Sequence, residues 1–410
     1  MNDDDGGARG APPPLARVHD PALDGLRGLA ILLVLLYHFN VLHQPRTFGE
    51  ALWRGAMNAG WVGVDLFFVL SGFLITGILL DDKARVREAS SGDAPVRVSL
   101  VGYLARFSLR RVLRIFPLYY AFLFASFVVL PRAAPFIGNG GITTVLPDDR
   151  WWFWLYLPNF LFARLGEFVG GRHFHLTWSL GVEEQFYLCW PLVVWFLDVK
   201  RLRALCIGLI VCAPIVRAVL DDGGASWVAL FVWPHTRMDT LASGALLATF
   251  LAQGAPALTA RARAALSLVV VVALLHAGWQ VHARGQYAQF MPGVVVSGLT
   301  LNALGFAALT ALVRASPTGG AWRRAFSFAP LRLCGRYAYG LYLVHVFVQH
   351  LVVARFVDDA RVVAFFGSRL ALQVAFTSAC TLASLALAVV VFHTIEEPFL
   401  RLKRVARSPR

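Results

Sequence analysis

Charged residues are scarce in this chain. They make up 15% of its 410 residues, and lysine occurs only as Lys83, Lys200 and Lys403. Hydrophobic residues make up 58%, and the mean hydropathy is +0.62. A soluble protein needs far fewer apolar residues to fill its core, so the composition predicts an integral membrane protein. The net charge of +14 would favour nucleic-acid binding in a soluble protein. In a membrane protein the basic residues are counted loop by loop, because they set the orientation of the chain. We therefore expect no nucleic-acid partner.

Cysteine is also sparse, with an odd number of residues and no CxxC pair. This pattern signals neither a disulfide framework nor a zinc site, and small packing residues are the favoured interpretation. The five cysteines are Cys189, Cys206, Cys212, Cys334 and Cys380.

His173 and His175 form an HxH pair in a long loop. Two histidines at this spacing can serve a metal, but no third ligand lies near them in the sequence. A solvated loop is therefore the favoured interpretation, and we predict no metal.

The first 20 residues are acidic and proline-rich, and they lack the basic start and cleavage site of a signal peptide. We predict a disordered tail over 1–20 and a first helix that is retained. A single transmembrane domain over 21–400 and a basic tail over 401–410 complete the expected organisation.

Long apolar runs predict an all-α membrane domain of about ten helices. The predicted spans are residues 26–44, 60–80, 104–130, 178–198, 203–220, 237–253, 264–282, 293–314, 334–354 and 368–393. An aromatic stretch from Trp151 to Phe162 is too short to span and is interrupted by Pro158, which is typical of an interfacial or re-entrant segment.

The basic residues predict the orientation of the chain. With both termini in the cytoplasm, the inner segments hold 25 of the 38 Lys and Arg residues and the outer loops hold 10. This excess agrees with the usual cytoplasmic bias and with an even number of spans. The Arg-, Ala-, Gly- and Val-rich composition suits a GC-rich bacterial genome. We therefore predict a multi-pass protein of the bacterial inner (cytoplasmic) membrane.

The first predicted span contains Arg27 and, eleven residues later, His38. Eleven residues at about 100° each return almost to the starting direction and rise roughly 16 Å, so the two side chains share one face. His38 would lie near the bilayer midplane, where an ionisable group is costly unless it is paired or faces a polar cavity. The alternatives are a functional pair, or an Arg that reaches headgroups and a His bonded to a neighbouring helix.

The third predicted span begins with four arginines in nine residues: Arg106, Arg110, Arg111 and Arg114. Residues three and four apart are neighbours on a helix, so several guanidinium groups should converge at the cytoplasmic end. Anchoring at the membrane surface explains two or three of them. The guanidinium fork matches phosphate oxygens, so four arginines that reach into the helix favour a phosphate-binding site.

Acidic residues occur inside the second and fourth predicted spans. Asp65 lies near the outer end of the second span, and Ser71 lies near its middle beside a glycine, a pair that suits close helix packing. Glu183 and Glu184 lie well inside the fourth span and point about 100° apart. A purely structural role would need two buried partners, so a functional site is the favoured interpretation.

The later spans carry further ionisable groups. Arg237 and Asp239 open the sixth span and can pair with each other, with Asp65 or with a glutamate of the fourth span. His345 lies inside the ninth span. We expect all of these groups to face the bundle interior.

Glu396 and Glu397, near the end of the tenth span, could brace the arginine cluster. Together, the polar residues form layers: cations at the cytoplasmic end, a histidine near the midplane, and acids in the outer half. Such layers suit a path in which a phosphate-bearing donor docks from inside and meets an acceptor from outside.

Six motifs in this order resemble the acyltransferase-3 family of membrane acyltransferases, over about residues 20–403. They are the Arg-x10-His of the first span, VGVDLFFVLSGFLIT, the Arg-x-x-Arg of the third span, WSLGVEEQFY, YGLYLVH and IEEPF. The resemblance implies a ten-helix bundle that moves an acyl group, usually acetyl from acetyl-CoA on the cytoplasmic side, to a hydroxyl of an exported glycan or related acceptor. Many relatives carry a C-terminal periplasmic esterase-like domain. This sequence ends soon after the tenth predicted span, so we expect the stand-alone form here.

The resemblance also implies roles for individual residues. His38 would be the catalytic residue, and Arg27 its partner in the motif. The donor would be bound by Arg111 and Arg114, together with Arg110. Beyond the resemblance, the sequence offers Glu183 and Glu184 as catalytic candidates that could orient the histidine or bind the acceptor. The candidate substrate-binding residues are Asp65, Ser71, Trp178, Tyr187, Arg237, Asp239 and His345.

The expected chemistry is O-acyl transfer. A neutral histidine can take the proton of a sugar hydroxyl as the hydroxyl attacks the thioester, and a covalent acyl-histidine is an open alternative. The expected partners are the bilayer, acyl-CoA and a glycan or glycosylated small molecule, and homo-oligomers are compatible with the sequence. A transporter or flippase would instead move substrate without modifying it, and a sensor or scaffold would tolerate loss of the buried charges.

Overall fold

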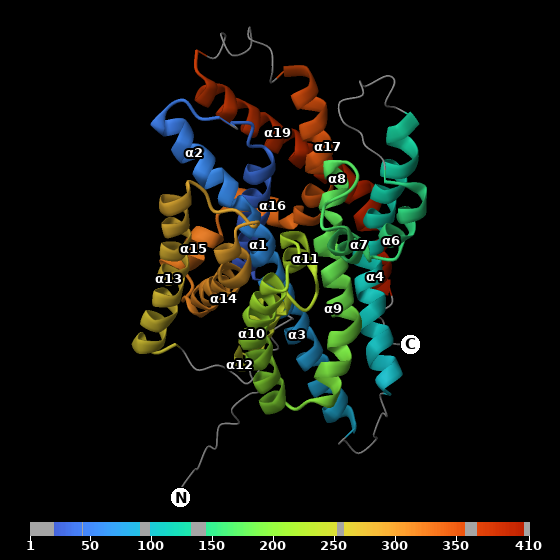
Figure 1. Ribbon diagram of the computed structural model, residues 1–410. Coiled ribbons are helices and arrows are strands. Elements are labelled where there is room, and N and C mark those ends of the chain that lie inside the picture. Colours follow the sequence, from blue (N-terminus) through green and yellow to red (C-terminus); the bar gives the residue numbers. More distant parts are fainter. Residues whose placement is uncertain are drawn as a thin grey trace, which may run out of the picture.

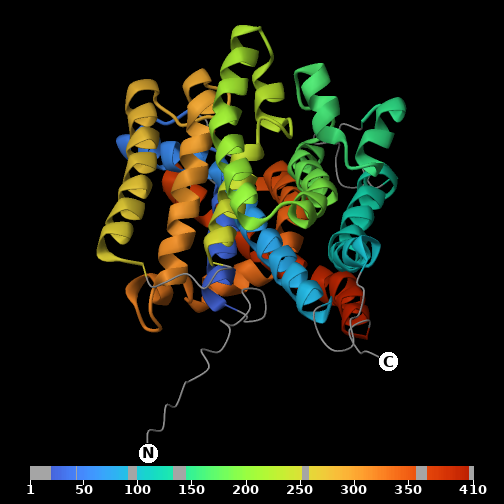
Figure 2. The same ribbon diagram turned by 90° about the horizontal axis from the view of Figure 1, so that it is seen from below.

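The computed structural model describes residues 20–42, 44–90, 99–132, 145–251, 258–356 and 367–405. These residues form helices and connecting turns without a strand, and the long helices pack side by side (Figures 1 and 2). The all-α prediction is confirmed for this part of the chain. Apart from Asp20, the predicted N-terminal tail lies outside the described residues.

The longer helices are α1 (Pro21–His38), α2 (Phe48–Asn58), α3 (Gly63–Ser90), α4 (Leu100–Phe124), α9 (Thr177–Phe196), α10 (Val199–Asp222), α12 (Met238–Leu251), α13 (Ala260–Arg284), α14 (Leu299–Ala315), α16 (Ala329–Arg336), α17 (Ala338–Phe356), α19 (Arg369–Val391) and α20 (Glu397–Val405). Shorter helices in the connections are α6 (Arg150–Trp154), α7 (Pro158–Leu165), α8 (Arg172–His175), α11 (Trp227–Val232) and α15 (Ala321–Phe326). Further turns are the 3-10 helices Ala59–Val62 and Pro147–Asp149 and the π-helical turns Ala125–Val129, Val294–Gly298 and Phe392–Glu396.

Seven segments of the described chain are long and apolar enough to cross a membrane. They correspond to the first, second, third, fifth, seventh, eighth and tenth predicted spans, so a multi-pass protein is supported. The other three predicted spans correspond to α9, α12 and α17. The helix α12 has 14 residues, and α9 and α17 carry glutamates and histidines in their apolar runs. The count of ten and the cytoplasmic position of both termini stay predictions.

Glycines bring the backbone of α1 into contact with that of α16. A Cβ atom on Gly28 would lie 1.9 Å from the carbonyl oxygen of Leu331, and one on Gly335 would lie 1.8 Å from that of Asp24. Only a residue without a side chain fits such an approach. The predicted ninth span, 334–354, is consequently divided: its first residues belong to α16, which packs on α1, and α17 begins at Ala338.

Replacing Gly28 with leucine should prevent this contact. The new side chain would meet backbone atoms, which cannot move aside, so we expect a loss of about 3 kcal/mol in stability and a strongly reduced folded yield. Fluorescence-detected size exclusion of the solubilised protein measures that yield. Gly208→Leu is the matched control, because nothing lies within 4 Å of its Cβ position. Equal yields for both variants would contradict the contact between α1 and α16.

The aromatic stretch, which was predicted to be too short to span, forms the two short helices α6 and α7. The two helices are separated at Tyr156, whose backbone is left-handed with φ of 58°. Pro158 begins α7, where its missing N–H costs no hydrogen bond. Trp151 and Trp154 are exposed, as rings at a membrane interface commonly are.

Candidate functional site

His38 is the last residue of α1, so the first helix ends earlier than the predicted 44. Its Nδ1 lies 2.9 Å from the carbonyl oxygen of Val34, one turn earlier. A carbonyl oxygen only accepts, so this contact assigns the ring proton to Nδ1 and leaves the lone pair on Nε2. The imidazole is half-buried. Such a histidine can accept a proton or attack a carbonyl carbon.

Two glutamines satisfy the backbone where α1 ends. Gln349 of α17 donates its side-chain amide to the carbonyl oxygen of His38. Gln373 of α19 donates to the carbonyl oxygen of Phe39 at 2.8 Å and accepts from the N–H of Val41 at 2.9 Å. Free backbone groups inside a membrane protein need such partners. They allow the helix to end within an apolar sequence, which the hydrophobicity alone did not predict.

The imidazole of His345 packs against that of His38. Their ring centroids are 4.8 Å apart, and the ring planes cross at 67°. His345 is fully buried, and its Nδ1 lies 3.0 Å from the carbonyl oxygen of Leu341, which repeats the arrangement of His38. Its Nε2 has no hydrogen-bond partner among the described residues. The fold thus brings together two histidines that are 307 positions apart in the sequence.

Arg27 lies at the opposite end of α1 from His38. Its Nη1 donates to Asp24 at 3.0 Å, and its side chain is 30% exposed. It interacts electrostatically with Arg114 and Tyr187. Eleven residues at about 1.5 Å each separate Arg27 from the histidine by roughly 16 Å along the helix. The two residues therefore occupy two different polar regions that are joined by one helix.

Three of the four arginines of α4 interact with one another: Arg111 interacts electrostatically with Arg110 and Arg114. Arg106 is exposed and donates to the backbone of its own helix. Arg110 pairs with Asp82 of α3. Arg111 and Arg114 are half-buried, and the Nε of Arg111 is buried without a hydrogen-bond partner in the described chain. Each four-residue step drifts by about 40° around a helix, so an arginine two steps away already faces elsewhere.

Arg111 connects this cluster to α9. Its guanidinium carbon lies 5.8 Å from the ring centre of Phe107 and 5.9 Å from that of Tyr187. The hydroxyls of Tyr187 and Ser71 are 2.6 Å apart, and Glu183 interacts with both side chains. Glu183 also interacts electrostatically with Arg111. A hydroxyl, a phenol and a carboxyl group from α3 and α9 therefore lie beside the inward-facing arginines.

Glu184 lies on another side of α9 from Glu183, as adjacent helical positions require. Its Oε1 is buried and, in the part of the chain that the structure describes, has no hydrogen-bond partner. The hydroxyl of Tyr156 is also buried without a partner there, and it interacts electrostatically with Glu184. Within the described ranges, neither glutamate hydrogen-bonds to His38, so these contacts do not give them an orienting role.

Glu396 lies at the arginine end of the site, where the sequence suggested that it and Glu397 could brace the arginine cluster. It is buried in the π-helical turn between α19 and α20, and it interacts electrostatically with Arg114. π-Helical turns occur often at functional sites. Glu397 instead pairs with His393 at 2.6 Å and with Arg401 at 3.2 Å. Of the two acids in the IEEPF motif, only Glu396 therefore approaches the arginine cluster.

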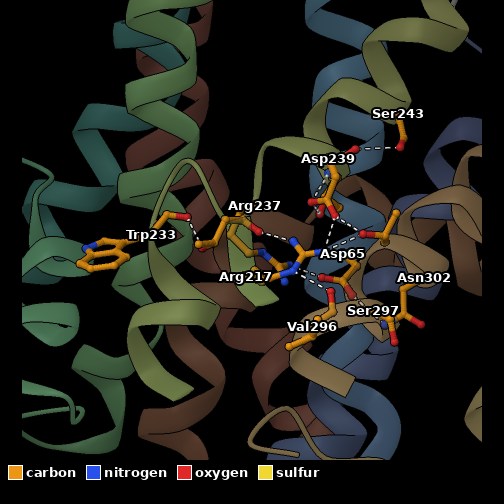
Figure 3. Close-up of polar contacts among 12 residues, drawn as sticks. Asp65, Arg217, Trp233, Arg237, Asp239, Ser243, Val296, Ser297 and Asn302 are labelled. Carbon is orange, nitrogen blue, oxygen red and sulfur yellow. Dashed lines mark hydrogen bonds and ion pairs between the residues drawn. The ribbon is translucent and has the colours of Figure 1, made fainter. Parts of the chain in front are cut away.

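A separate cluster of charges is buried between α3, α10, α12 and α14 (Figure 3). Arg237 pairs with Asp65, and Asn302 donates to the same carboxylate at 2.9 Å. Arg217 donates to Asp239 at 2.8 Å. All four charged side chains are fully buried. Among the partners predicted for Arg237, the fold selects Asp65, and Asp239 pairs with an arginine that sequence reasoning did not single out.

Three aromatic rings surround the guanidinium of Arg237. The ring centres of Phe68, Trp178 and Phe231 lie 5.4, 5.6 and 5.2 Å from its central carbon. Cation–π contacts of this kind are stronger when they are shielded from water. Asp65, Arg237 and Asp239 were predicted to bind substrate. In the structure Asp65 pairs with Arg237, and Asp239 pairs with Arg217. Their evident effect is to hold four helices together.

The HxH pair does not form a solvated loop, so that prediction was wrong. His173 and His175 belong to α8, and His173 is buried with its ring centre 5.2 Å from that of Phe347. Burial lowers the pKa of each histidine to about 4. No group of three or more ligating side chains able to hold a metal occurs in the described ranges. The pair therefore packs among aromatic rings.

Comparison with known families adds to this geometry. The model of the acyltransferase-3 domain matches residues 20–393. This chain belongs to the acyltransferase-3 family. The match includes the helices that carry His38, the inward-facing arginines, the glutamates of α9 and His345.

Similar members of the acyltransferase-3 family are bacterial. The chain is 27% identical over 341 residues to the peptidoglycan O-acetyltransferase OatA of Listeria monocytogenes, which covers 80% of this chain and 49% of that protein. It is 32% identical over 237 residues to the putative peptidoglycan O-acetyltransferase YrhL of Bacillus subtilis, a match that covers 56% of this chain and 33% of that protein. It is 27% identical over 348 residues to the O-acetyltransferase OatA of Staphylococcus aureus, a match that covers 79% of this chain and 50% of that protein. The chain spans half or less of the length of these relatives, and no solved structure matches it.

Proposed function

We propose that this acyltransferase-3 protein is an O-acetyltransferase of the bacterial inner membrane. It moves an acetyl group from acetyl-CoA on the cytoplasmic side to a hydroxyl of a glycan on the outer side. The observation that carries the proposal is His38, with a free Nε2 at one end of α1, and an arginine-rich region at the other end of the same helix. The names of the relatives support acetyl as the transferred group and peptidoglycan as the first acceptor to test.

Arg111 and Arg114 fit the phosphates of a coenzyme A donor. Both are half-buried, and the free Nε of Arg111 leaves one donor available for a ligand. A guanidinium binds phosphate oxygens through parallel hydrogen bonds. Arg110 is already paired with Asp82, so we expect it to contribute less to donor binding than Arg111 and Arg114. The acyl thioester supplies an activated carbonyl carbon.

His38 performs the proton transfer. Its Nε2 takes the proton from the acceptor hydroxyl as the new C–O bond forms to the acetyl carbon and the C–S bond breaks. The same nitrogen then gives the proton to the departing sulfur, so the products are an acetyl ester and a free thiol. The hydrogen bond that Nδ1 donates to the carbonyl oxygen of Val34 keeps the lone pair on Nε2 whenever the ring is neutral, so the reacting nitrogen is ready for each cycle. A general base of this kind accelerates a reaction by about 10²- to 10⁴-fold.

The arginine pair provides a prediction about the donor. Arg111→Ala and Arg114→Ala should each raise the KM for acetyl-CoA by about tenfold, with little change in the KM for the acceptor, because a charged hydrogen bond is lost. Steady-state kinetics in membrane vesicles measure both constants. Arg106→Ala is the matched control, since this arginine of the same helix is exposed and bonds to its own backbone. A donor KM that stays constant in both variants would indicate that these arginines only anchor the helix at the membrane surface.

Direct detection of the product tests the function itself. Membrane vesicles that contain the protein are supplied with acetyl-CoA labelled in the acetyl group and with peptidoglycan fragments or other glycans. Mass spectrometry should then find an acetyl group bound as an ester to the acceptor, and mild alkali should release it. Movement of substrate across the membrane without an acetylated product would instead identify a transporter.

A further inference from the structure

We propose that His345 is a positioning residue that stabilises the protonated form of His38 during acetyl transfer. The inference rests on the proposed function and adds a residue to its chemistry. Its basis is the edge contact between the two imidazoles, with 4.8 Å between the ring centroids, and the buried Nε2 of His345, which has no hydrogen-bond partner among the residues that the structure describes.

The tautomer of each ring follows from its backbone contact. In both histidines, Nδ1 lies within hydrogen-bonding distance of the carbonyl oxygen one turn earlier, at 2.9 Å for His38 and 3.0 Å for His345. Both Nδ1 atoms therefore carry hydrogen, and both Nε2 atoms carry lone pairs. While His38 is neutral, it offers no hydrogen to its neighbour. The lone pair of His345 stays unsatisfied, which is costly for a fully buried polar atom.

Proton transfer changes this contact. When His38 takes the hydroxyl proton on Nε2, its ring becomes positively charged. The neutral ring of His345, which keeps a lone pair on Nε2, lies in edge contact with this charge and stabilises it. This stabilisation is present after proton transfer and absent before it, and only such differences lower the barrier. The proton leaves again with the sulfur of the donor, so His345 keeps its own proton on Nδ1 and is unchanged after each cycle.

The surroundings of His38 support this role. Its other charged or titratable neighbours among the described residues are Tyr37, whose ring centroid lies 5.1 Å from that of His38, and Arg172 and His175 of α8. None of them carries a negative charge that would balance a positive imidazolium. No carboxylate hydrogen-bonds to His38 in the described part of the chain. Gln349, one turn after His345 on α17, holds the carbonyl oxygen of His38. The helix α17 therefore fixes the backbone of His38 and places one acceptor beside its ring.

Two substitutions separate ring packing from the lone pair. His345→Phe keeps an aromatic ring against His38 but removes the acceptor, whereas His345→Gln keeps an acceptor oxygen without the ring. We expect His345→Phe to lower kcat by about 10- to 100-fold, with both KM values unchanged. We expect His345→Gln to recover most of this loss. The measurement is steady-state acetyl transfer in vesicles, normalised to folded protein by fluorescence-detected size exclusion.

His276→Phe is the control, because His276 is a half-buried histidine of α13 that contacts Gln280 and Tyr287 instead of His38. Full kcat in His345→Phe would overturn the inference, since packing alone would then suffice. A raised KM at constant kcat would also overturn it, because His345 would then bind substrate. Absence of acetyl transfer by the unmodified protein would instead reject the proposed function, so the two failures are distinguishable.

Discussion

Replacing His38 with alanine should lower acetyl transfer by about 10²- to 10⁴-fold while the protein still folds into the membrane. The loss is large because His38 supplies the general base of the proposed reaction, and a general base contributes a factor of this size. The side chain is half-buried at the end of α1, so its removal leaves little uncompensated packing. The measurement is labelled acetyl esterified to the glycan per folded protein, with saturating donor and acceptor.

Two controls make this result specific. His276→Ala removes a half-buried histidine from α13 and should retain activity. Binding of acetyl-CoA should also survive in His38→Ala, because the arginine end of the site lies roughly 16 Å away along the helix. Normal product from His38→Ala would remove this histidine from the chemistry. Loss of the folded protein would show that the residue is needed for assembly.

Replacing Asp65 with alanine should cause one of the largest losses of stability in this chain, about 3–5 kcal/mol. The substitution leaves Arg237 fully buried without its carboxylate, and its Nε and Nη1 already have no hydrogen-bond partner in the described chain. Three aromatic rings contact this guanidinium, but they cannot replace the negative charge. The midpoint of thermal unfolding in detergent measures the effect.

A double substitution tests the cause of this loss. Asp65→Leu combined with Arg237→Met removes both charges, so it should be more stable than Asp65→Ala alone. Arg201→Ala is the exposed control: its pair with Asp198 lies at the surface, and its removal should cost at most about 1 kcal/mol. Similar losses for the buried and exposed pairs would argue against a structural role. A double variant that folds but cannot transfer acetyl would show that the cluster also serves the reaction.

Much of the helical framework was predictable from hydrophobicity alone. Runs of apolar residues located seven of the ten predicted spans, because a helix that crosses a bilayer needs about 20 such residues. They did not fix the helix ends: the first helix ends at His38, earlier than the predicted 44. The three spans that do not meet this criterion correspond to α9, α12 and α17, which are shorter or interrupted by polar residues. Two of them carry site residues, Glu183 on α9 and His345 on α17. Chemistry inside a membrane requires polar groups, and these weaken the hydrophobic signal.

Which arginines and acids face the site was less predictable. Spacing placed Arg110, Arg111 and Arg114 near one another, but it could not show that Arg110 pairs with Asp82 of another helix. It also could not show that only one acid of the IEEPF motif turns toward the arginines. These details depend on the rotation of each helix, which neighbouring helices set. Gln349 follows His345 by one helical turn, so the sequence indicated that the two side chains share a face of the helix. Its contact with His38 could not be predicted, because it joins distant parts of the chain.

The sequence by itself determined the membrane class, the family motifs and the residue types that acetyl transfer would need. Composition and short-range spacing suffice for these, because the bilayer selects long apolar helices and a motif lies within one helix. Only the tertiary structure decided where α1 ends, which arginines face inward and which imidazole lies beside His38. Each of these depends on contacts between helices that are far apart in the sequence. The pairing of His38 with His345 is such a contact, since it exists only when α1 and α17 pack together.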